Sequence, residues 1–414
     1  MRRLLANAAP SETDASRADR SLYIALAAMY IAQGLPIGFA FNAMGTLIRE
    51  SGHDLAMVGM TGLAFLPWAL KFLWAGAVDN ACRRWGMARV ALALQALIVA
   101  GFLGLAPLSL RTQLGVALAA LVWLNLLCAT QDIVTNACAV TRLQGRRAGA
   151  ANAIQVAGFL LGMLAGGGGV LLLYARFGWM TAMALLAGAM ATVFLLLAGN
   201  RGWAVDAGQA APAGRARLRD SWKRADFAWA VLLALSFKTA SSALPALLQP
   251  WLLDHGFGVA RIGTLQLSNM LATAVGALLL GMPLVRRLGS RRAVGAGLAL
   301  AALGQGGASL LSGWPGFPAW AAFALFGAQS LLEGAMYVTI WSLFMNWASP
   351  SRPGTDYTAM QCCESLGSTL AIAAVAPLAG LLGYGYVFAG IWALSWLLLG
   401  VAALCLPRLR LCAD

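Results

Sequence analysis

Five ionisable side chains lie inside long apolar stretches of the chain: Lys71, Asp132, Lys238, Glu333 and Glu364. A charge in membrane hydrocarbon is costly, so such a residue faces a water-filled cavity, pairs with an opposite charge, or gives up its charge. Proteins that move solutes across membranes use all three arrangements. The placement is therefore typical of a membrane transporter.

Polar side chains share helical faces with these charges. Around Asp132, the residues Asn125, Thr135 and Asn136 lie three, four or seven positions away, a spacing that places them on one face of a helix. Similar faces recur in other apolar stretches. The residues predicted to bind a substrate are Tyr30, Gln33, Asn42, Asn125, Asn136, Lys238, Ser242, Gln249, Gln266, Asn269, Gln329, Tyr337, Trp341 and Gln361. The alternative is that the neutral ones only join helices through hydrogen bonds of about 1 kcal/mol each.

The three buried acids, Asp132, Glu333 and Glu364, are the predicted proton carriers. Lys238 can attract an anionic substrate or pair with a carboxylate. Because buried charges cost more than neutral polar groups, we expect Lys238, Asp132 and Glu333 to form one central site. Glu364 is expected to act mainly as a contact between helices.

A second group, Lys71, Asp79 and Arg83, is predicted to gate the cytoplasmic opening. Lys71 is expected near Asp79, with its charged end extended toward the cytoplasmic surface. Asp79 can cap a neighbouring helix or pair with an arginine. The equally weighted alternative is that this charged segment only anchors the chain at the membrane surface.

The composition is that of a membrane protein. Of 414 residues, 60% are hydrophobic and 11% charged, and the mean hydropathy is +0.75. About 20 helical residues cross the hydrocarbon of a bilayer. Twelve such runs are predicted, at residues 21–48, 56–78, 90–108, 113–140, 150–174, 179–199, 227–253, 262–284, 293–312, 318–347, 357–382 and 385–406. The predicted fold class is an all-α integral membrane bundle of twelve transmembrane helices.

The net charge of +14 comes from Lys and Arg residues that are concentrated in every second loop between the predicted spans. If the N-terminus is cytoplasmic, the inside segments carry 23 Lys and Arg residues and the outside loops carry 4. This bias predicts a multi-pass membrane protein with both termini in the cytoplasm. The basic character then reflects topology and attraction to membrane lipid, and no nucleic-acid partner is expected.

Metal and enzyme sites are not expected. The seven cysteines show no CxxC spacing, and the two histidines, His53 and His255, fall in predicted outside loops. No Ser/His/Asp or Cys/His arrangement is apparent, so we expect no enzyme, no metal and no cofactor. A membrane receptor or scaffold that binds without transport remains an alternative.

Glycine spacing predicts helix contacts. Gly158, Gly162 and Gly166 recur every four residues and predict a close-packing face. The Gly34-Leu35-Pro36 sequence either loosens a helix beside a binding site or marks a packing kink.

The chain also repeats internally. Glu50-Ser51-Gly52 matches Asp254-His255-Gly256, and the segment 83–86 matches 286–289, at the same place in each half. The predicted organisation is a cytoplasmic tail (1–20), a six-helix half (21–199), a cytoplasmic linker (200–226), a second six-helix half (227–406) and a cytoplasmic tail (407–414). Duplicated halves of this kind are typical of the major facilitator superfamily, whose substrate site lies between them.

Several segments resemble the muropeptide permease group of that superfamily. They are 22–36, Leu66 to Trp74, Ala129 to Val134, Phe237-Lys238, and Thr355 to Thr358 with Gln361. The resemblance covers nearly the whole chain and is nearest to the siderophore permease branch, of pyochelin and rhizobactin type. The segment 76–89 also resembles the superfamily's cytoplasmic signature between its second and third spans.

The resemblance implies import of a ferric siderophore, such as a ferripyochelin-like complex, across the bacterial inner membrane into the cytoplasm. It implies proton-coupled alternating access in a monomer. The alternative is a muropeptide or small-drug transporter of the same fold. Muropeptide permeases carry a further acid about four positions after the Gln-Asp motif, where this chain has Asn136. That difference favours the siderophore and places proton coupling more on Asp132.

Overall fold

The structure is a computed structural model that describes residues 12–53, 55–200, 203 and 215–413. The predicted tail residues 1–11, residues 201–202 and 204–214 of the linker, and Asp414 lie outside the described residues. Every regular element within the described ranges is helical. The all-α prediction is therefore confirmed.

The helices of the first half run from α1 to α9. Their bounds are α1 (Glu12–Gly38), η1 (Phe39–Ala43), α2 (Met44–Glu50), α3 (Leu55–Gly59), η2 (Met60–Phe65), α4 (Leu66–Leu70), α5 (Phe72–Trp85), α6 (Met87–Leu105), α7 (Leu114–Arg142), η3 (Gly145–Arg147), α8 (Ala148–Leu164), η4 (Ala165–Gly169) and α9 (Val170–Gly199).

The short helix α10 (Leu218–Trp222) precedes the second half. Its helices are α11 (Phe227–Ser236), α12 (Thr239–Asp254), α13 (Val259–Gly276), η6 (Ala277–Gly281), α14 (Met282–Ser312), α15 (Ala319–Trp347), α16 (Pro353–Leu382), α17 (Tyr384–Cys405) and η7 (Leu406–Arg408). The elements η1, η4 and η6 are single π-helical turns inside spans.

The described residues account for the twelve predicted crossings. They contain nine helical segments that are long and apolar enough to cross a membrane, or ten when the bent pair Met57–Leu70 and Phe72–Trp85 counts as one span. Two of these, Gly145–Gly199 and Arg261–Ser312, hold 55 and 52 residues, enough for two crossings each. Each turns at a glycine with positive φ, Gly178 or Gly289. Dividing both at these glycines gives twelve crossings.

The turning glycines also follow the internal repeat. Gly52 and Gly256, Gly86 and Gly289, and Gly178 and Gly383 all have positive φ, and the members of each pair lie 203 to 205 residues apart. Positive φ is unfavourable for residues with a side chain. The same backbone geometry therefore recurs at corresponding turns of the two repeats.

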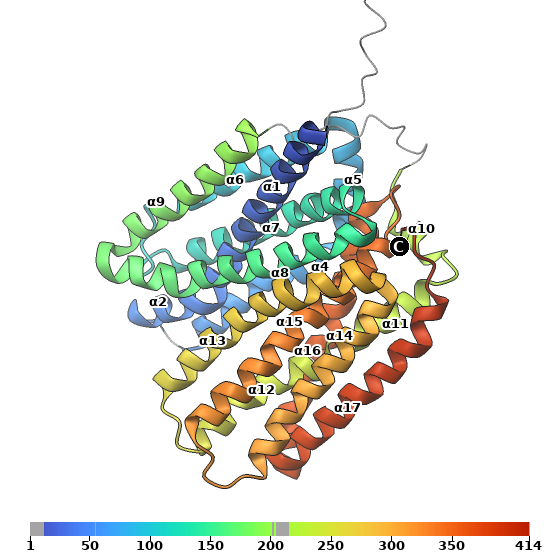
Figure 1. Cartoon of the computed structure of the whole chain (residues 1–414). Helices are drawn as coiled ribbons and strands as arrows, with labels where there is room; N and C mark the ends of the chain where they lie inside the picture. The colour runs from blue at the N-terminus through green and yellow to red at the C-terminus, as the bar shows by residue number, and fades with distance from the viewer. Residues whose placement is uncertain (1–11, 54, 201–202, 204–214, 414) are drawn as a thin grey trace, which may run out of the picture.

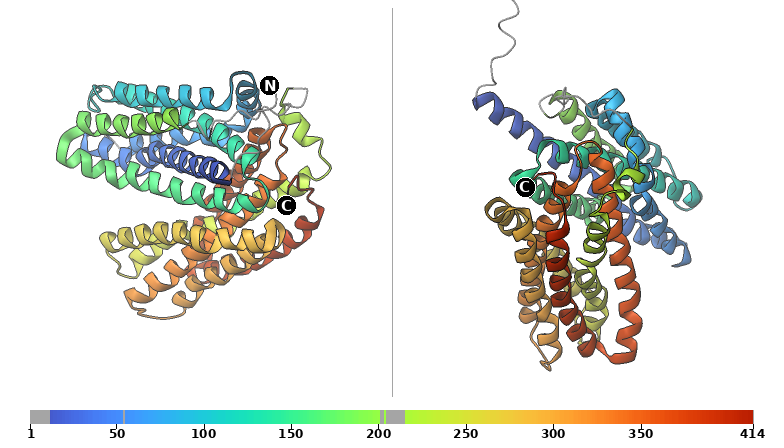
Figure 2. Two further views of the ribbon diagram at one scale, coloured as in Figure 1. Left: turned by 45° about the horizontal axis from the view of Figure 1, so that its top comes forward. Right: turned by 90° about the vertical axis from the view of Figure 1, so that its right-hand side faces the viewer.

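The two groups of helices meet at one end of the molecule and diverge toward the other (Figures 1 and 2). The start of α1, helix α10 and the C-terminal residues all lie at the end where they meet (Figure 2). There α5, α7 and α8 pack against α13 to α16. A hydrophobic core of buried residues from both groups, including Leu26, Ile133, Phe344 and Met360, fills this junction.

The predicted close-packing face of the fifth span is confirmed. A Cβ atom added at Gly162 would lie 2.2 Å from the carbonyl oxygen of Ile31, and one added at Gly166 would lie 1.9 Å from that of Leu35. Gly34 of α1 faces α8 equally closely, since its Cβ would meet the carbonyl oxygen of Phe159 at 2.1 Å. Glycine is therefore required for α1 and α8 to approach each other, and Gly34 belongs to this packing.

Candidate functional site

A buried ion pair joins α7 to the break between α4 and α5. Lys71 lies at this break, where the span bends by 55°. Its ammonium pairs with the Asp132 carboxylate of α7 and donates to Gln361 Oε1 of α16 at 2.6 Å. The two charged side chains are only 5% and 4% exposed. Because Gln361 comes from the second half, this contact connects the two halves.

Asn136 and Tyr30 complete this group, which we call the central cluster (Tyr30, Lys71, Asp132, Asn136 and Gln361). The amide of Asn136 donates to Asp132 Oδ2 at 2.8 Å and to Gln361 Oε1 at 3.2 Å. The Tyr30 hydroxyl donates to Asn136 Oδ1 at 2.9 Å. The ionised carboxylate of Asp132 therefore faces an ammonium and an amide donor, which offset the cost of its burial.

The position of Lys71 corrects one prediction. We expected Lys71 to extend toward Asp79 and the cytoplasmic surface, but it points into the central cluster. The helix breaks at Lys71, and Asp132 lies opposite this break. The ammonium of Lys71 therefore has an oppositely charged partner inside the bundle. A buried pair satisfies the charge without extension to the surface.

Residues that sequence reasoning missed extend the central cluster. The Tyr357 hydroxyl of α16 donates to Asn152 Oδ1 at 2.7 Å and lies 3.0 Å from Gln155 Oε1, both on α8. Gln155 in turn reaches Asn136 Oδ1 at 3.5 Å. The available signal was the spacing of three between Asn152 and Gln155 within an apolar span.

A second ion pair lies within the second half. Lys238 is at the break between α11 and α12, and its Nζ lies 2.6 Å from Glu364 Oε1 on α16. The ammonium also lies 5.2 Å from the centroid of the Tyr337 ring, a cation–π contact. Ser368 donates to Glu364 Oε1 at 3.2 Å. Glu364 is thus the direct counter-ion of Lys238, which corrects its expected lesser role.

Glu333 has a different environment. Its Oε1 accepts hydrogen bonds from the amides of Gln305, at 2.7 Å, and Gln329, at 3.0 Å. Glu333 is buried, with 6% of its surface exposed. Even so, it forms no ion pair with any described residue. Gln305 of α14 was not predicted, because a single glutamine in an apolar span gives no spacing signal. The expected group of Lys238, Asp132 and Glu333 therefore divides among three separate environments.

The other predicted binding residues fall into two sets. Gln33 and Asn125 are buried and join helices of the first half, through Thr135 Oγ1 at 2.7 Å and the Trp68 indole at 3.1 Å. This matches the alternative in which neutral groups only link helices. The remaining members lie at exposed or half-buried positions: Asn42, Gln249 and Gln266 are exposed, and Ser242, Asn269, Tyr337 and Trp341 are half-buried.

Asp79 caps the start of α16. Its carboxylate accepts hydrogen bonds from the backbone N–H groups of Gly354, at 3.1 Å, and Thr355, at 2.8 Å, and from the Thr355 hydroxyl at 2.6 Å. The neighbouring Arg83 donates to the carbonyl of Ser351. A carboxylate at a helix N-terminus is favourable because it satisfies free N–H groups and opposes the helix dipole. Of the alternatives for this segment, these contacts favour helix capping between the halves.

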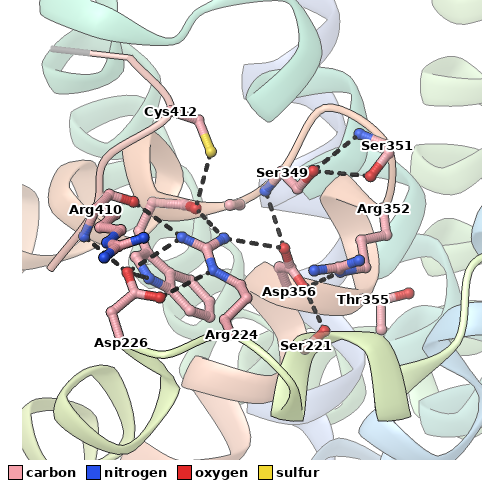
Figure 3. A network of polar contacts seen from close by, with 12 residues as sticks. Ser221, Arg224, Asp226, Ser349, Ser351, Arg352, Thr355, Asp356, Arg410 and Cys412 are labelled. Carbon is pink, nitrogen blue, oxygen red and sulfur yellow. Dashed lines mark hydrogen bonds and ion pairs between the residues drawn. The ribbon is translucent and has the colours of Figure 1, made fainter. Parts of the chain in front are cut away.

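The end of the linker is attached to the same end of α16 (Figure 3). Ser221 of α10 donates to Asp356, and Arg224 lies 3.7 Å from the same carboxylate. Arg224 also pairs with Asp226 at 3.2 Å and donates to the carbonyls of Trp347 and Arg410. One guanidinium therefore connects the linker, the end of α15, the start of α16 and the C-terminal segment.

Asp226 receives several hydrogen bonds in this network. Its Oδ2 accepts from the Trp347 indole at 2.8 Å and from the Arg410 backbone at 2.7 Å. Burial acts to raise the pKa of Asp226, but the hydrogen bonds from Arg224, Arg410 and Trp347 outweigh it and lower the pKa below its usual value.

Comparison with known proteins identifies the family. Residues 22–371 match the Major Facilitator Superfamily. The anhydromuropeptide permease of Escherichia coli K12 is 30% identical over 277 residues, which cover 64% of this chain and 55% of that protein. AmpG 4 of Rickettsia felis is 27% identical over 263 residues, which cover 59% of this chain and 63% of that protein. The chain thus spans less than two thirds of the length of these relatives.

Solved structures of the same fold align over nearly the whole chain. A bacterial homologue of the iron transporter ferroportin in its outward-facing state has a TM-score of 0.69 at 14% identity, and covers 94% of this chain and 99% of that one. The transporter FucP in its outward conformation has a TM-score of 0.65 at 13% identity, and covers 92% and 98%. At these identities the likeness concerns the fold alone. The family match over residues 22–371 shows that the chain belongs to the major facilitator superfamily.

Proposed function

We propose that this chain is a secondary transporter that moves a small polar solute across the bacterial cytoplasmic membrane. Residues 21–199 and 227–406 would act as its two halves, joined by the linker 200–226, with both termini in the cytoplasm. The observation that carries the proposal is the central cluster, in which Lys71 and Asp132 of one half are bonded to Gln361 of the other. Rearrangement of the halves must change these contacts, as alternating access requires.

The conformation agrees with this proposal. The halves are in contact at the end that carries α10 and the C-terminal segment, and Asp79 and Arg83 hold the start of α16 there. We propose that this end is the closed cytoplasmic gate and that the structure is outward-facing. Lys71 then acts in the central cluster, and Asp79 and Arg83 act in the gate.

The relatives favour a muropeptide-type solute. One of them is named an anhydromuropeptide permease, whereas neither matched relative described above is named for a siderophore. The muropeptide alternative is therefore better supported than import of a ferric siderophore, and we adopt it. A sugar-peptide presents hydroxyl, amide and carboxylate groups, which suit a site with an ammonium, a carboxylate, amides and tyrosine hydroxyls.

We further propose that transport is driven by protons, with Asp132, Glu333 and Glu364 as the available carriers, in a protein that acts as a monomer. A buried carboxylate that changes partners during transport can bind and release a proton. The protein needs no cofactor in this mechanism.

The test is uptake by the full chain reconstituted in liposomes. A radiolabelled anhydromuramyl tripeptide should accumulate when the outside is acidified, and ferripyochelin labelled with radioactive iron should not. Asp132→Asn should abolish accumulation, because it removes the counter-charge of Lys71. Uptake of neither solute above protein-free liposomes would refute transport of both, and uptake of ferripyochelin alone would restore the siderophore hypothesis.

A further inference from the structure

The two ion pairs differ in how a solute could reach them. The Lys71 and Asp132 side chains are 5% and 4% exposed, whereas the Lys238 side chain is 31% exposed and that of Glu364 is 9% exposed. Both pairs contact α16. Gln361 and Glu364 are three residues apart and so share a face of that helix. Because Gln361 reaches Lys71 in the other half, this face of α16 lies toward the junction between the halves.

We propose that Lys238 binds a carboxylate of the transported solute, and that Glu364 occupies this position when no solute is bound. This inference rests on the proposed transport function and assigns the solute class and the coupling residue. The Lys238 ammonium lies 2.6 Å from Glu364 and has the Tyr337 ring on one side. Among the described residues, no second carboxylate is bonded to it. A free carboxylate can therefore compete with Glu364 for the same cation.

The exchange couples a proton to the solute. When the solute carboxylate pairs with Lys238, Glu364 loses its counter-charge in a poorly hydrated site. Glu364 then binds one proton from the outer solution. When the solute leaves on the cytoplasmic side, Lys238 attracts Glu364 again, and the carboxyl group releases that proton there. One carboxylate and one proton cross together, so this step moves no net charge.

The other titratable groups around Glu364 do not replace it in this role. Tyr337 of α15 interacts electrostatically with both Glu364 and Glu333. Cys362 of α16 interacts with Glu364 and with Lys71 and Asp132 of the first half. Glu333 is bonded to glutamines of α14 and α15, inside the second half. Asp132 keeps Lys71 and Asn136 as partners in a buried cluster. Lys238 also interacts electrostatically with Glu333, but among the described residues its ion-pair partner is Glu364. A solute at Lys238 therefore removes the direct counter-ion of Glu364.

The experiment separates solute exchange from proton coupling in liposomes that contain the full chain. The probes are a radiolabelled anhydromuramyl tripeptide and the same tripeptide with its carboxylates converted to amides. Counterflow measures exchange without a gradient, and accumulation driven by a pH difference measures coupling. The wild-type protein should exchange the acid form in preference to the amide form and should accumulate it.

Glu364→Gln keeps the side-chain shape and should retain counterflow while losing pH-driven accumulation by about tenfold or more. Lys238→Met should lose the preference for the acid form. Thr369→Ala on the same helix is the matched control. Thr369 is exposed, and among the described residues its hydroxyl bonds only to the Ser365 carbonyl of its own helix.

Three results would overturn the inference while leaving transport intact. They are coupling retained in Glu364→Gln, coupling lost in Glu333→Gln but not in Glu364→Gln, and equal exchange of the acid and amide forms by the wild-type protein. Absence of counterflow by the wild-type protein with either probe would instead refute the proposed muropeptide function, and the carboxylate exchange with it.

Discussion

The two membrane lysines have closely similar surroundings. Each lies at a helix break, each pairs with a carboxylate, and each has an aromatic ring nearby, with Lys71 5.3 Å from the Trp68 ring centroid and Lys238 5.2 Å from that of Tyr337. They differ in burial and in the number of other hydrogen-bonding partners. Lys71 is therefore suited to hold the halves together, and Lys238 to exchange its partner.

We predict that Lys71→Met and Asp132→Asn each destabilise the protein by about 3–5 kcal/mol, because each leaves an uncompensated buried charge. The double variant Lys71→Met with Asp132→Asn should be less destabilised than the sum of the single changes, since no charge remains. Thermal unfolding in detergent measures both. Additive effects would show that the ion pair contributes no coupling energy.

The sequence was sufficient to identify the buried charges but not their partners. Lys71, Asp132, Lys238, Glu333 and Glu364 were recognised because charges are rare in apolar spans. Their pairing depends on where each span breaks and on how the spans are rotated about their axes. The spacing of residues along one helix predicts neither. For this reason Lys71 was expected at the surface, although it lies beside Asp132.

Among elements, the fold was the most predictable level. Hydrophobic length located the spans, and glycine at four-residue intervals identified the α8 face that contacts α1. The backbone leaves helical geometry at Gly178 and Gly289, which lie between the predicted runs 150–174 and 179–199 and between 262–284 and 293–312. The π-helical turns at η1, η4 and η6 have no recognisable sequence signal.

We predict opposite effects of alanine at two glycines of the fifth span. Gly162→Ala would place a Cβ 2.2 Å from the Ile31 carbonyl oxygen, so α1 and α8 must separate, at a cost of about 1–3 kcal/mol. Gly168→Ala is the matched control, because its Cβ would meet nothing within 4 Å and alanine favours helix by up to about 1 kcal/mol. The melting temperature in detergent should fall for the first and stay level or rise for the second. Equal melting temperatures would contradict the close contact.

At the scale of the whole molecule, the junction end is held by segments from several parts of the chain. Arg224 and Asp226 bind the linker to Trp347 and to the C-terminal segment (Figure 3). The backbone of Cys412 donates to the Asn346 carbonyl at 2.7 Å, and the Asn346 side chain accepts from the Gly145 backbone of the first half at 2.7 Å. The C-terminal segment thus lies over a contact between the halves. Charge patterning predicts that this end is cytoplasmic, but it gives no indication of the network.

The network predicts a pH dependence of stability. The folded-state pKa of Asp226 lies below its unfolded value of about 3.9, so its stabilising contribution is present above that pH and is lost as the pH falls through the folded value. Asp226→Asn should therefore lower the melting temperature at pH 7, and its difference from the wild-type protein should shrink below about pH 4. Asp19→Asn, in an exposed pair with Arg147, should have little effect at any pH. A constant difference for Asp226→Asn across this range would contradict the assignment.

The closed end also gives a test of alternating access and of orientation. Gln144, just before η3, donates to the Ala348 carbonyl of the second half at 2.9 Å. In the proposed orientation this contact must open for release into the cytoplasm. In a chain whose seven native cysteines are replaced, Gln144→Cys with Ala348→Cys should cross-link, stop counterflow and recover after reduction. Ser21→Cys with Asn200→Cys is the matched control, because these two bonded residues both belong to the first group of helices and their cross-link should leave counterflow intact. A membrane-impermeant thiol reagent should reach Gln144→Cys only from the cytoplasmic side. Labelling from outside would show that the topology is the opposite of the proposed one. Counterflow through a fully cross-linked junction would refute a gate at this end.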